Sequence, residues 1–306
     1  MIKKFSKRKE TPYISVIMVD GSFRESFHAV DFFCQQSLQR ENYELIWVEY
    51  YSEVKSELKE EISKYSNARI LTLNRSGIYH SSYCFNAGIE ASRGEVIFIP
   101  DADVVVEKNF LEKAYKDHKE NNKLVMYYYR LDEPEEKHRS EISIEHLKKI
   151  CKLVNPGNCG PCLSVRKKWL MEVNGYELHP IMCTGFHANG LEMYTRLKNK
   201  GLHVRWHPDL KLFHPWHPFS VVGSPLYKVQ RILIDYKLQN LIKTTFLGID
   251  PSRNIEMPPD LITQLENAKK KYKLDEAYDS WLKLKIDPGS PQDELFAWQS
   301  YGDKQT

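Results

Sequence analysis

The feature that most constrains the fold is an alternation, from residue 14 to about residue 129, of short apolar runs with amphipathic stretches. This alternation is typical of parallel βαβ units. Right-handed crossovers place the helices on both faces of a mostly parallel sheet, so ligands are expected at the carboxyl ends of its strands. Strands are predicted at Ile14–Val19, Tyr43–Glu49, Arg69–Leu73, Glu95–Ile99 and Leu124–Tyr129, and helices at Phe23–Gln39, Glu53–Tyr65, Ser81–Ala91 and Asn109–Glu120.

The pattern changes after this α/β region. Residues 130–222 are rich in proline, glycine and histidine, which predicts loops over a site. From Pro225 onward, apolar residues recur at helical spacing, and further helices are predicted at Leu261–Lys271 and Glu276–Leu284, before a polar tail at Pro288–Thr306. We therefore predict an α/β domain over residues 1–222 and a helical extension with a polar tail over residues 223–306. The extension is expected to dock on the domain, or on a partner subunit in an oligomer, through its apolar stripe.

The charge balance argues against nucleic acid as a partner. Lysine and arginine total 44 against 41 acidic residues, and this margin is too small for a polyanion-binding surface. The basic run at residues 3–9 is interpreted as a solvated tail, with peripheral contact to anionic lipid as the alternative. No run approaches the roughly 20 apolar residues of a membrane span, and the N-terminus lacks the apolar core of a signal peptide. A cytoplasmic location is expected, with the inner membrane face as the alternative.

The six cysteines are expected to be reduced thiols, because no export signal accompanies them. Cys159 and Cys162 form a Cys-x-x-Cys pair, for which a zinc site is the alternative. No second pair follows at zinc-finger spacing, and this disfavours zinc.

Two acids meet at the end of the fourth predicted strand, where the apolar run of residues 94–100 stops at Asp101-Ala102-Asp103. Hard divalent cations prefer oxygen ligands, and Mg²⁺ commonly takes one or two carboxylates while ligand phosphates fill its other positions. The acid pair therefore suits a metal, Mn²⁺ or Mg²⁺, that is bridged to a diphosphate. A turn or a helix cap is the alternative interpretation.

Upstream segments give this acid pair a context. Leu73-Asn74-Arg75-Ser76-Gly77 and Asn86-Ala87-Gly88 come before Gly94-Glu95, which leads into the strand. In this order and at this spacing, the sequence resembles the family 2 glycosyltransferases of GT-A fold, over about residues 13–217. The resemblance implies a nucleotide-sugar half at about 13–129 and an acceptor half at about 130–222. It also implies metal-assisted transfer of a sugar, with inversion, from a nucleotide-diphosphate donor to a hydroxyl of a glycan or glycolipid, in polysaccharide biosynthesis.

The resemblance further implies nucleotide contacts at the ends of the first two strands. Val19 and Asp20 end the first strand, and Glu49 ends the second, where the family usually has aspartate. A carboxylate there accepts the imide N–H of uracil, so a UDP-sugar is favoured; an ordinary strand-end acid is the alternative. Arg75 would approach the nucleotide or hold its loop. Asp101, Ala102 and Asp103 would face the ribose and the metal.

A histidine after the acceptor region is implied as a further metal ligand. His214 is the first candidate and His217 the second, because a strand-like run at residues 210–213 delivers both to the expected end of the domain. Imidazole suits Mn²⁺ better than Mg²⁺. Packing in a proline-rich loop is the alternative.

The catalytic base is where the chain departs from the family pattern. The family has a Glu-Asp pair at the start of a helix, and here Asn189 and Gly190 occupy those positions. Glu192, which matches a later family acid, is the predicted base, and His187 is the second candidate. The alternative for Glu192 is a helical acid paired with Arg196 at four-residue spacing.

Two other functions compete with this prediction. The missing acid pair favours a degenerate, non-catalytic subunit that binds nucleotide sugar or serves as a scaffold. A nucleotidyltransferase that activates sugar phosphates is disfavoured, because no glycine-rich loop follows the first strand.

Overall fold

The core of the protein is a seven-stranded, mostly parallel sheet. The computed structural model describes residues 12–22, 24–183, 186–217 and 225–275, so the basic run at 3–9, the predicted helix at 276–284 and the tail lie outside the described residues. The strand order is β3-β2-β1-β4-β6-β5-β7, and β6 alone among these strands runs antiparallel to its neighbours. The strands are β1 (Ile14–Asp20), β2 (Tyr43–Glu49), β3 (Ala68–Thr72), β4 (Val96–Pro100), β5 (Leu124–Asp132), β6 (Cys162–Arg166) and β7 (His203–His214).

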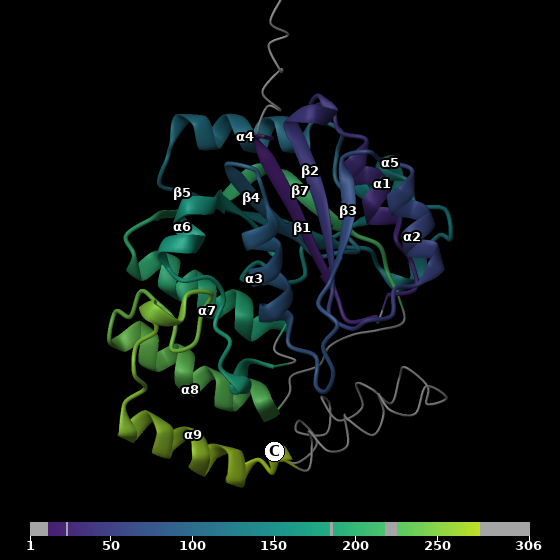
Figure 1. The fold of residues 1–306 in the computed structure, drawn as a ribbon. Helices are drawn as coiled ribbons and strands as arrows, with labels where there is room; N and C mark the ends of the chain where they lie inside the picture. The colour runs from purple at the N-terminus through teal and green to yellow at the C-terminus, as the bar shows by residue number, and fades with distance from the viewer. Residues whose placement is uncertain (1–11, 23, 184–185, 218–224, 276–306) are drawn as a thin grey trace, which may run out of the picture.

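Helices cover both faces of this sheet (Figure 1). The helices are α1 (His28–Cys34), α2 (Ser56–Ser63), α3 (Ser81–Ala91), α4 (Phe110–Glu120), α5 (Ile144–Ile150), α6 (Lys167–Glu172), α7 (Phe186–Asn199), α8 (Pro225–Gln239) and α9 (Pro259–Lys271). Short 3-10 turns occupy residues 40–42, 135–137, 180–182 and 251–253. The predicted α/β class with C-terminal helices is confirmed. All five predicted strands are present, the second with the predicted ends and the other four with ends shifted by one to three residues.

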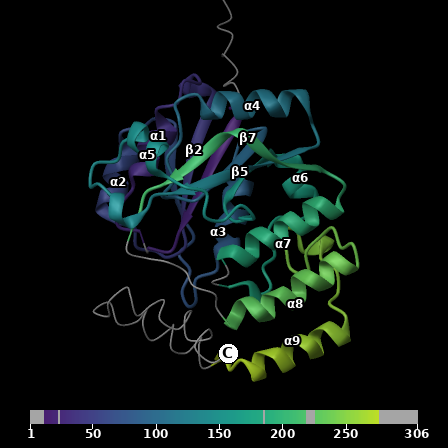
Figure 2. The ribbon, with the colours of Figure 1, turned by 180° about the vertical axis from the view of Figure 1, so that it is seen from behind.

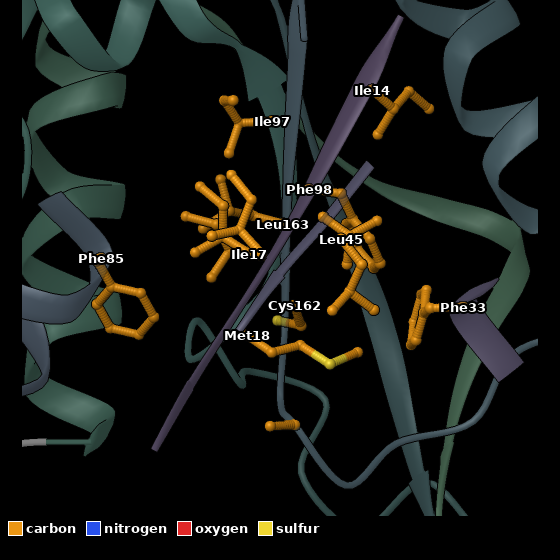
Figure 3. Close-up of a cluster of buried hydrophobic side chains, with 14 of the residues drawn as sticks. Ile14, Ile17, Met18, Phe33, Leu45, Phe85, Ile97, Phe98, Cys162 and Leu163 are labelled. Carbon is orange, nitrogen blue, oxygen red and sulfur yellow. The ribbon is translucent and has the colours of Figure 1, made fainter. Parts of the chain in front are cut away.

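The inner strands β1, β2 and β4 are buried along almost their whole length and are mostly apolar, because helices cover them on both sides. Alternate side chains of a strand point to opposite faces. Figure 3 shows Ile17 of β1 on the same side as Phe85 of α3, and Phe33 of α1 on the other side. The ring of Phe33 lies 5.6 Å from that of Phe98 in β4. This two-sided core fixes where the carboxyl ends of β1, β2 and β4 lie.

The Asn-Ala-Gly sequence has a structural role in α3. A Cβ atom at Gly88 would lie 2.5 Å from Cγ2 of Ile17, so only glycine lets the helix approach β1 this closely. Asn86 donates to the carbonyl of Tyr176 at 2.9 Å and accepts from its amide at 2.6 Å. The motif therefore holds α3 against the sheet and ties residues 174–178 to it.

The C-terminal helices form an outer layer on the α3 side of the sheet. Helix α8 packs against α7, and α9 packs against α8, as Figure 2 shows from behind. A second apolar cluster fills these contacts with side chains that include Leu226, Val229, Leu233, Leu261 and Leu265. None of the described helices is both long enough and apolar enough to cross a bilayer. All six cysteines are free thiols.

Candidate active site

Two acids face each other at the carboxyl ends of β1 and β2. Asp20 and Glu49 are in register on the two parallel strands, and the Glu49 side chain is buried. Ser22 Oγ donates to Glu49 Oε1 at 3.1 Å, and the amide of Arg24 donates to Asp20 Oδ2 at 3.3 Å. Burial, and then the charge of Asp20, raise the pKa of Glu49 to about 7. Near neutral pH, Glu49 therefore exists in both its neutral and its charged form.

After β4 ends, the segment around Val105 runs antiparallel to the end of β7. Val105 and Phe213 exchange backbone hydrogen bonds, with N–O distances of 2.8 and 3.0 Å in the two directions. This antiparallel bridge holds the segment that carries Asp103 against the end of β7, where the histidines begin. Residues from distant parts of the chain are therefore brought to one edge of the sheet.

Asp103, His214 and His217 form what we call the acid–histidine cluster. Nε2 of each histidine lies 3.6 Å from Asp103 Oδ2, and the two Nε2 atoms are 3.2 Å apart. Among the described residues, these three form the group whose ligand atoms lie close enough to hold one metal ion. With metal–ligand bonds of about 2.1 Å, neighbouring ligand atoms lie about 3.0–3.4 Å apart. The spacing in the cluster therefore suits a single ion.

The environment of Asp103 also suits a cation. Its Oδ1 atom is buried and has no hydrogen-bond partner, while its Oδ2 atom forms an ion pair with Arg24. Burial raises the pKa of Asp103, but the charges of Arg24 and His214 outweigh it and hold that pKa well below its usual range. Burial lowers the pKa of His214, but the negative charge of Asp103 outweighs this effect and raises the pKa of His214 to about 9. Asp103 thus keeps a negative charge, and its Oδ1 atom has no hydrogen-bond partner in the protein.

A second layer of polar side chains surrounds the cluster. Asp132, at the end of β5, lies with Oδ1 2.9 Å from Nδ1 of His214. Arg130 Nε lies 3.0 Å from the same carboxylate oxygen, and Arg130 Nη1 donates to Asp101 Oδ2 at 3.0 Å. His28 Nε2 lies 2.9 Å from the carbonyl oxygen of Asp103. The two acids of the Asp-x-Asp sequence therefore have different partners, because Asp101 bonds to Arg130 and stands outside the cluster.

The other predicted nucleotide residues line the same edge of the sheet. Ala102 is buried and Val19 is half-buried. The exposed Arg75 places its guanidinium 3.6 Å from the centre of the Tyr83 ring, and its amide donates to the carbonyl of Tyr50 at 3.0 Å. Arg75 thus lies beside the carboxyl end of β2. Its contacts with Tyr50 and Tyr83 are compatible with the predicted role of holding its loop in place.

The prediction that Glu192 is the catalytic base requires correction. Its side chain is fully buried, and both of its carboxylate oxygens accept hydrogen bonds from Arg196 at 2.6 Å. Lys237 of α8 donates to Glu192 Oε1 at 2.6 Å as well. A general base must reach the acceptor proton, and a carboxylate held in this way between α7 and α8 does not. The predicted pairing with Arg196 is present, but it is buried rather than solvated.

The family's acid at the position of Gly190 would not fit this structure unless the backbone shifted. A Cβ atom at Gly190 would lie 1.9 Å from the carbonyl oxygen of Cys159. Asn189 is buried and donates to Ser81 Oγ at 2.6 Å. His187 is in the first turn of α7, and its side chain lies outside the described part of the structure. His187 therefore stays a prediction.

Several residues of the site were missed in the sequence, among them the charged residues Arg24, Arg130 and Asp132. Arg24 lies in the loop after β1, and Arg130 and Asp132 lie beyond the predicted end of the fifth strand at Tyr129. The alternating charged and apolar residues of Arg130-Leu131-Asp132 were the one signal that the strand continues.

The sheet, its helical layers and the acid–histidine cluster at its carboxyl edge define an α/β domain of GT-A type. Residues 28–173 match the sequence model described as glycosyl transferase family 2. The resemblance predicted from the sequence is therefore confirmed over this segment.

Solved structures with the same fold include those of S. aureus TarS. The TarS fragment 1–349 is 14% identical to this chain, with a TM-score of 0.54, and the match covers 96% of this chain and 92% of that one. The same fragment in complex with UDP-GlcNAc gives a TM-score of 0.55 and 14% identity, covering 95% and 92% of the two chains. The longer TarS chain is 13% identical with a TM-score of 0.55, and the match covers 94% of this chain and 55% of that one. No curated protein sequence matches this chain.

Proposed function

We propose that this protein is a metal-dependent glycosyltransferase that moves a sugar, with inversion, from a UDP-sugar to a hydroxyl group of a glycan or glycolipid. The observation that carries the proposal is the convergence of Asp103, His214 and His217 at the sheet edge that also presents Asp20 and Glu49. Ligands of open α/β sheets bind at this edge. One of the similar TarS structures contains UDP-GlcNAc, which makes that sugar nucleotide the first donor to test.

The acid–histidine cluster would hold the metal ion. One carboxylate and two imidazoles favour Mn²⁺ over Mg²⁺, because nitrogen ligands suit the transition metal. When bound, the ion neutralises the negative charge that develops on the departing nucleoside diphosphate. Arg24 is the cation that pairs with Asp103 in this structure, and in the donor complex its guanidinium would bind a phosphate oxygen.

The uracil would be recognised by the acids at the ends of β1 and β2. The ionised Glu49 carboxylate accepts a hydrogen bond, as the imide N–H of uracil requires, while Ser22 supports the same side chain. Asp20 lies beside it in register and is the second acceptor. Arg75, with its guanidinium over Tyr83, would close this end of the site. Asp101, held by Arg130, would face the ribose.

The acceptor proton would go to His187, since Glu192 is occupied by Arg196 and Lys237. A neutral imidazole at the start of α7 would accept this proton as the acceptor oxygen attacks the anomeric carbon on the face opposite the diphosphate.

The test is donor turnover in the presence and absence of Mn²⁺. UDP release from UDP-GlcNAc, measured for the wild type with and without Mn²⁺, should depend on the ion and be lost in Asp103→Asn. Glu107→Gln is the matched control, because Glu107 follows on the same segment but pairs with Lys148 at the surface. Equal metal-independent rates in all three proteins would contradict the proposal.

A non-catalytic nucleotide-sugar-binding subunit is the second candidate. The buried ion pairs of Glu192 and the close contact at Gly190 favour it, because together they remove the usual acids of α7 from the site. This function predicts Mn²⁺-dependent binding of UDP-GlcNAc with no release of UDP in the presence of any hydroxyl acceptor. Isothermal titration beside the turnover assay separates the two functions.

A further inference from the structure

We propose that Asp132 is a positioning residue that fixes the His214 ring so that its Nε2 atom is presented to the metal. The inference rests on the proposed function and extends it to a side chain outside the acid–histidine cluster. Asp132 and His214 are register partners at the ends of the neighbouring parallel strands β5 and β7. Their side chains meet at 2.9 Å, between Asp132 Oδ1 and His214 Nδ1.

The two nitrogens of the His214 ring have different partners. Nδ1 faces the carboxylate of Asp132, whereas Nε2 faces Asp103 at 3.6 Å and Nε2 of His217 at 3.2 Å. An ionised carboxylate only accepts hydrogen bonds, so Nδ1 must carry a proton and donate it. The lone pair of the neutral ring is then on Nε2, which is the atom that faces the cluster. A carboxylate bonded to the far nitrogen in this way orients metal-binding histidines and makes them more basic.

Two further contacts hold Asp132 in place. Its backbone exchanges hydrogen bonds with Lys152 at 2.9 and 3.0 Å, and Arg130 Nε lies 3.0 Å from its Oδ1 atom. The acceptor that faces Nδ1 is therefore fixed in position by its neighbours, as a positioning residue must be.

The same strand supplies a matched control pair. His207, also in β7, lies with Nε2 3.2 Å from Asp117 Oδ2 of α4, and neither residue contacts the acid–histidine cluster. Asp117→Asn removes a carboxylate from a histidine of β7 in the same way as Asp132→Asn. General damage to β7 would lower the metal affinity of both Asp117→Asn and Asp132→Asn. Loss of the orientation of His214 would lower it only in Asp132→Asn.

The experiment is a titration of the full-length protein with Mn²⁺ and no donor, followed by electron paramagnetic resonance of the free ion. We expect Asp132→Ala to weaken Mn²⁺ binding about 10–100-fold relative to the wild type. Asp132→Asn should lose less, about 3–10-fold, because the amide oxygen still accepts from Nδ1 without the charge. Asp117→Asn should bind as the wild type does, and the metal-free melting temperature of Asp132→Asn should stay within a few degrees of the wild type.

The possible outcomes separate this inference from the proposed function. If the wild type binds Mn²⁺ and both Asp132 variants bind it within about twofold of the wild type, Asp132 has no positioning role while the metal site stands. If Asp117→Asn loses as much affinity as Asp132→Asn, the effect is structural and the inference fails. If the wild type binds no Mn²⁺, the proposed metal dependence and this inference fail together. If Asp132→Ala does not fold, the comparison of Asp132→Asn with Asp117→Asn decides.

Discussion

Lys237 of α8 donates a 2.6 Å hydrogen bond to Glu192 of α7, and both side chains are fully buried. The same ammonium group bonds to Glu177 at 2.6 Å. Glu177 in turn accepts from the amides of Phe246 and Leu247, both at 2.8 Å. One lysine thus joins the C-terminal helices to the α/β domain by pairing with two buried carboxylates.

Removal of this lysine should destabilise the protein strongly. Lys237→Met leaves two buried carboxylates without their shared partner, and breaking a buried ion pair typically costs about 3–5 kcal/mol of unfolding free energy. Lys200→Met is the control, because Lys200 pairs with Glu172 at the surface and such pairs contribute about 1 kcal/mol or less. Urea unfolding of both variants measures the difference. Equal losses would show that the buried network does not hold α8 in place.

Glu192→Gln tests the corrected role of this residue. We expect a lower melting temperature, because the neutral amide pairs poorly with Arg196 and Lys237. In the folded fraction, the rate of sugar transfer should change by less than about tenfold, whereas loss of a general base costs about 10²–10⁴-fold. A loss of that size, with a normal melting temperature, would return the base to Glu192.

His187→Ala tests the remaining candidate base. We expect transfer to fall by about 10²–10⁴-fold, while Mn²⁺-dependent binding of UDP-GlcNAc is retained. His203→Ala is the control, because that exposed histidine begins β7 and bonds to Asn121. A transfer rate in His187→Ala equal to that of the control would exclude His187 as the base.

The pKa of Glu49 gives the protein a pH dependence with a defined sign. This pKa is raised from 4.5 to about 7, so between these two values the folded state binds more protons than the unfolded state. The contribution of Glu49 to stability is therefore complete below about pH 4.5 and falls as the pH rises to about 7. Glu49→Gln cannot lose a proton, so its unfolding free energy relative to the wild type should increase over this range. Urea unfolding at several pH values measures this, and a constant difference would contradict the shift.

The fold was predictable where periodicity is local. The runs that became β1 to β5 are apolar or alternating and are separated by helical stretches, so the sequence pattern alone indicates them. Strand β6 was missed because Cys162–Arg166 is short and follows a loop of proline and glycine. Strand β7 was recognised only near residues 210–213, because it contains Pro208 and has a register shift against β5. Such pairing depends on distant residues, which a local pattern does not contain.

The site was predictable only in part, for a related reason. The strand end before Asp103 indicated the acid of the cluster, and the strand-like run at residues 210–213 indicated its histidines. The four-residue spacing of Glu192 and Arg196 suits a surface pair and a buried pair equally, and the partner that decides, Lys237, lies on another helix. Asp132 was missed because its role depends on strand register rather than on any motif.

The bridge between Val105 and Phe213 has a consequence for the synthesis of the protein on the ribosome. The acid half of the cluster is translated with β4, whereas both histidines follow with β7, after most of the domain has left the exit tunnel. A nascent chain that ends before β7 carries Asp103 without its two imidazoles and without the strand that holds its loop. If the cluster holds an ion as proposed, such a chain should not retain it, and metal would be loaded only after β7 has been translated.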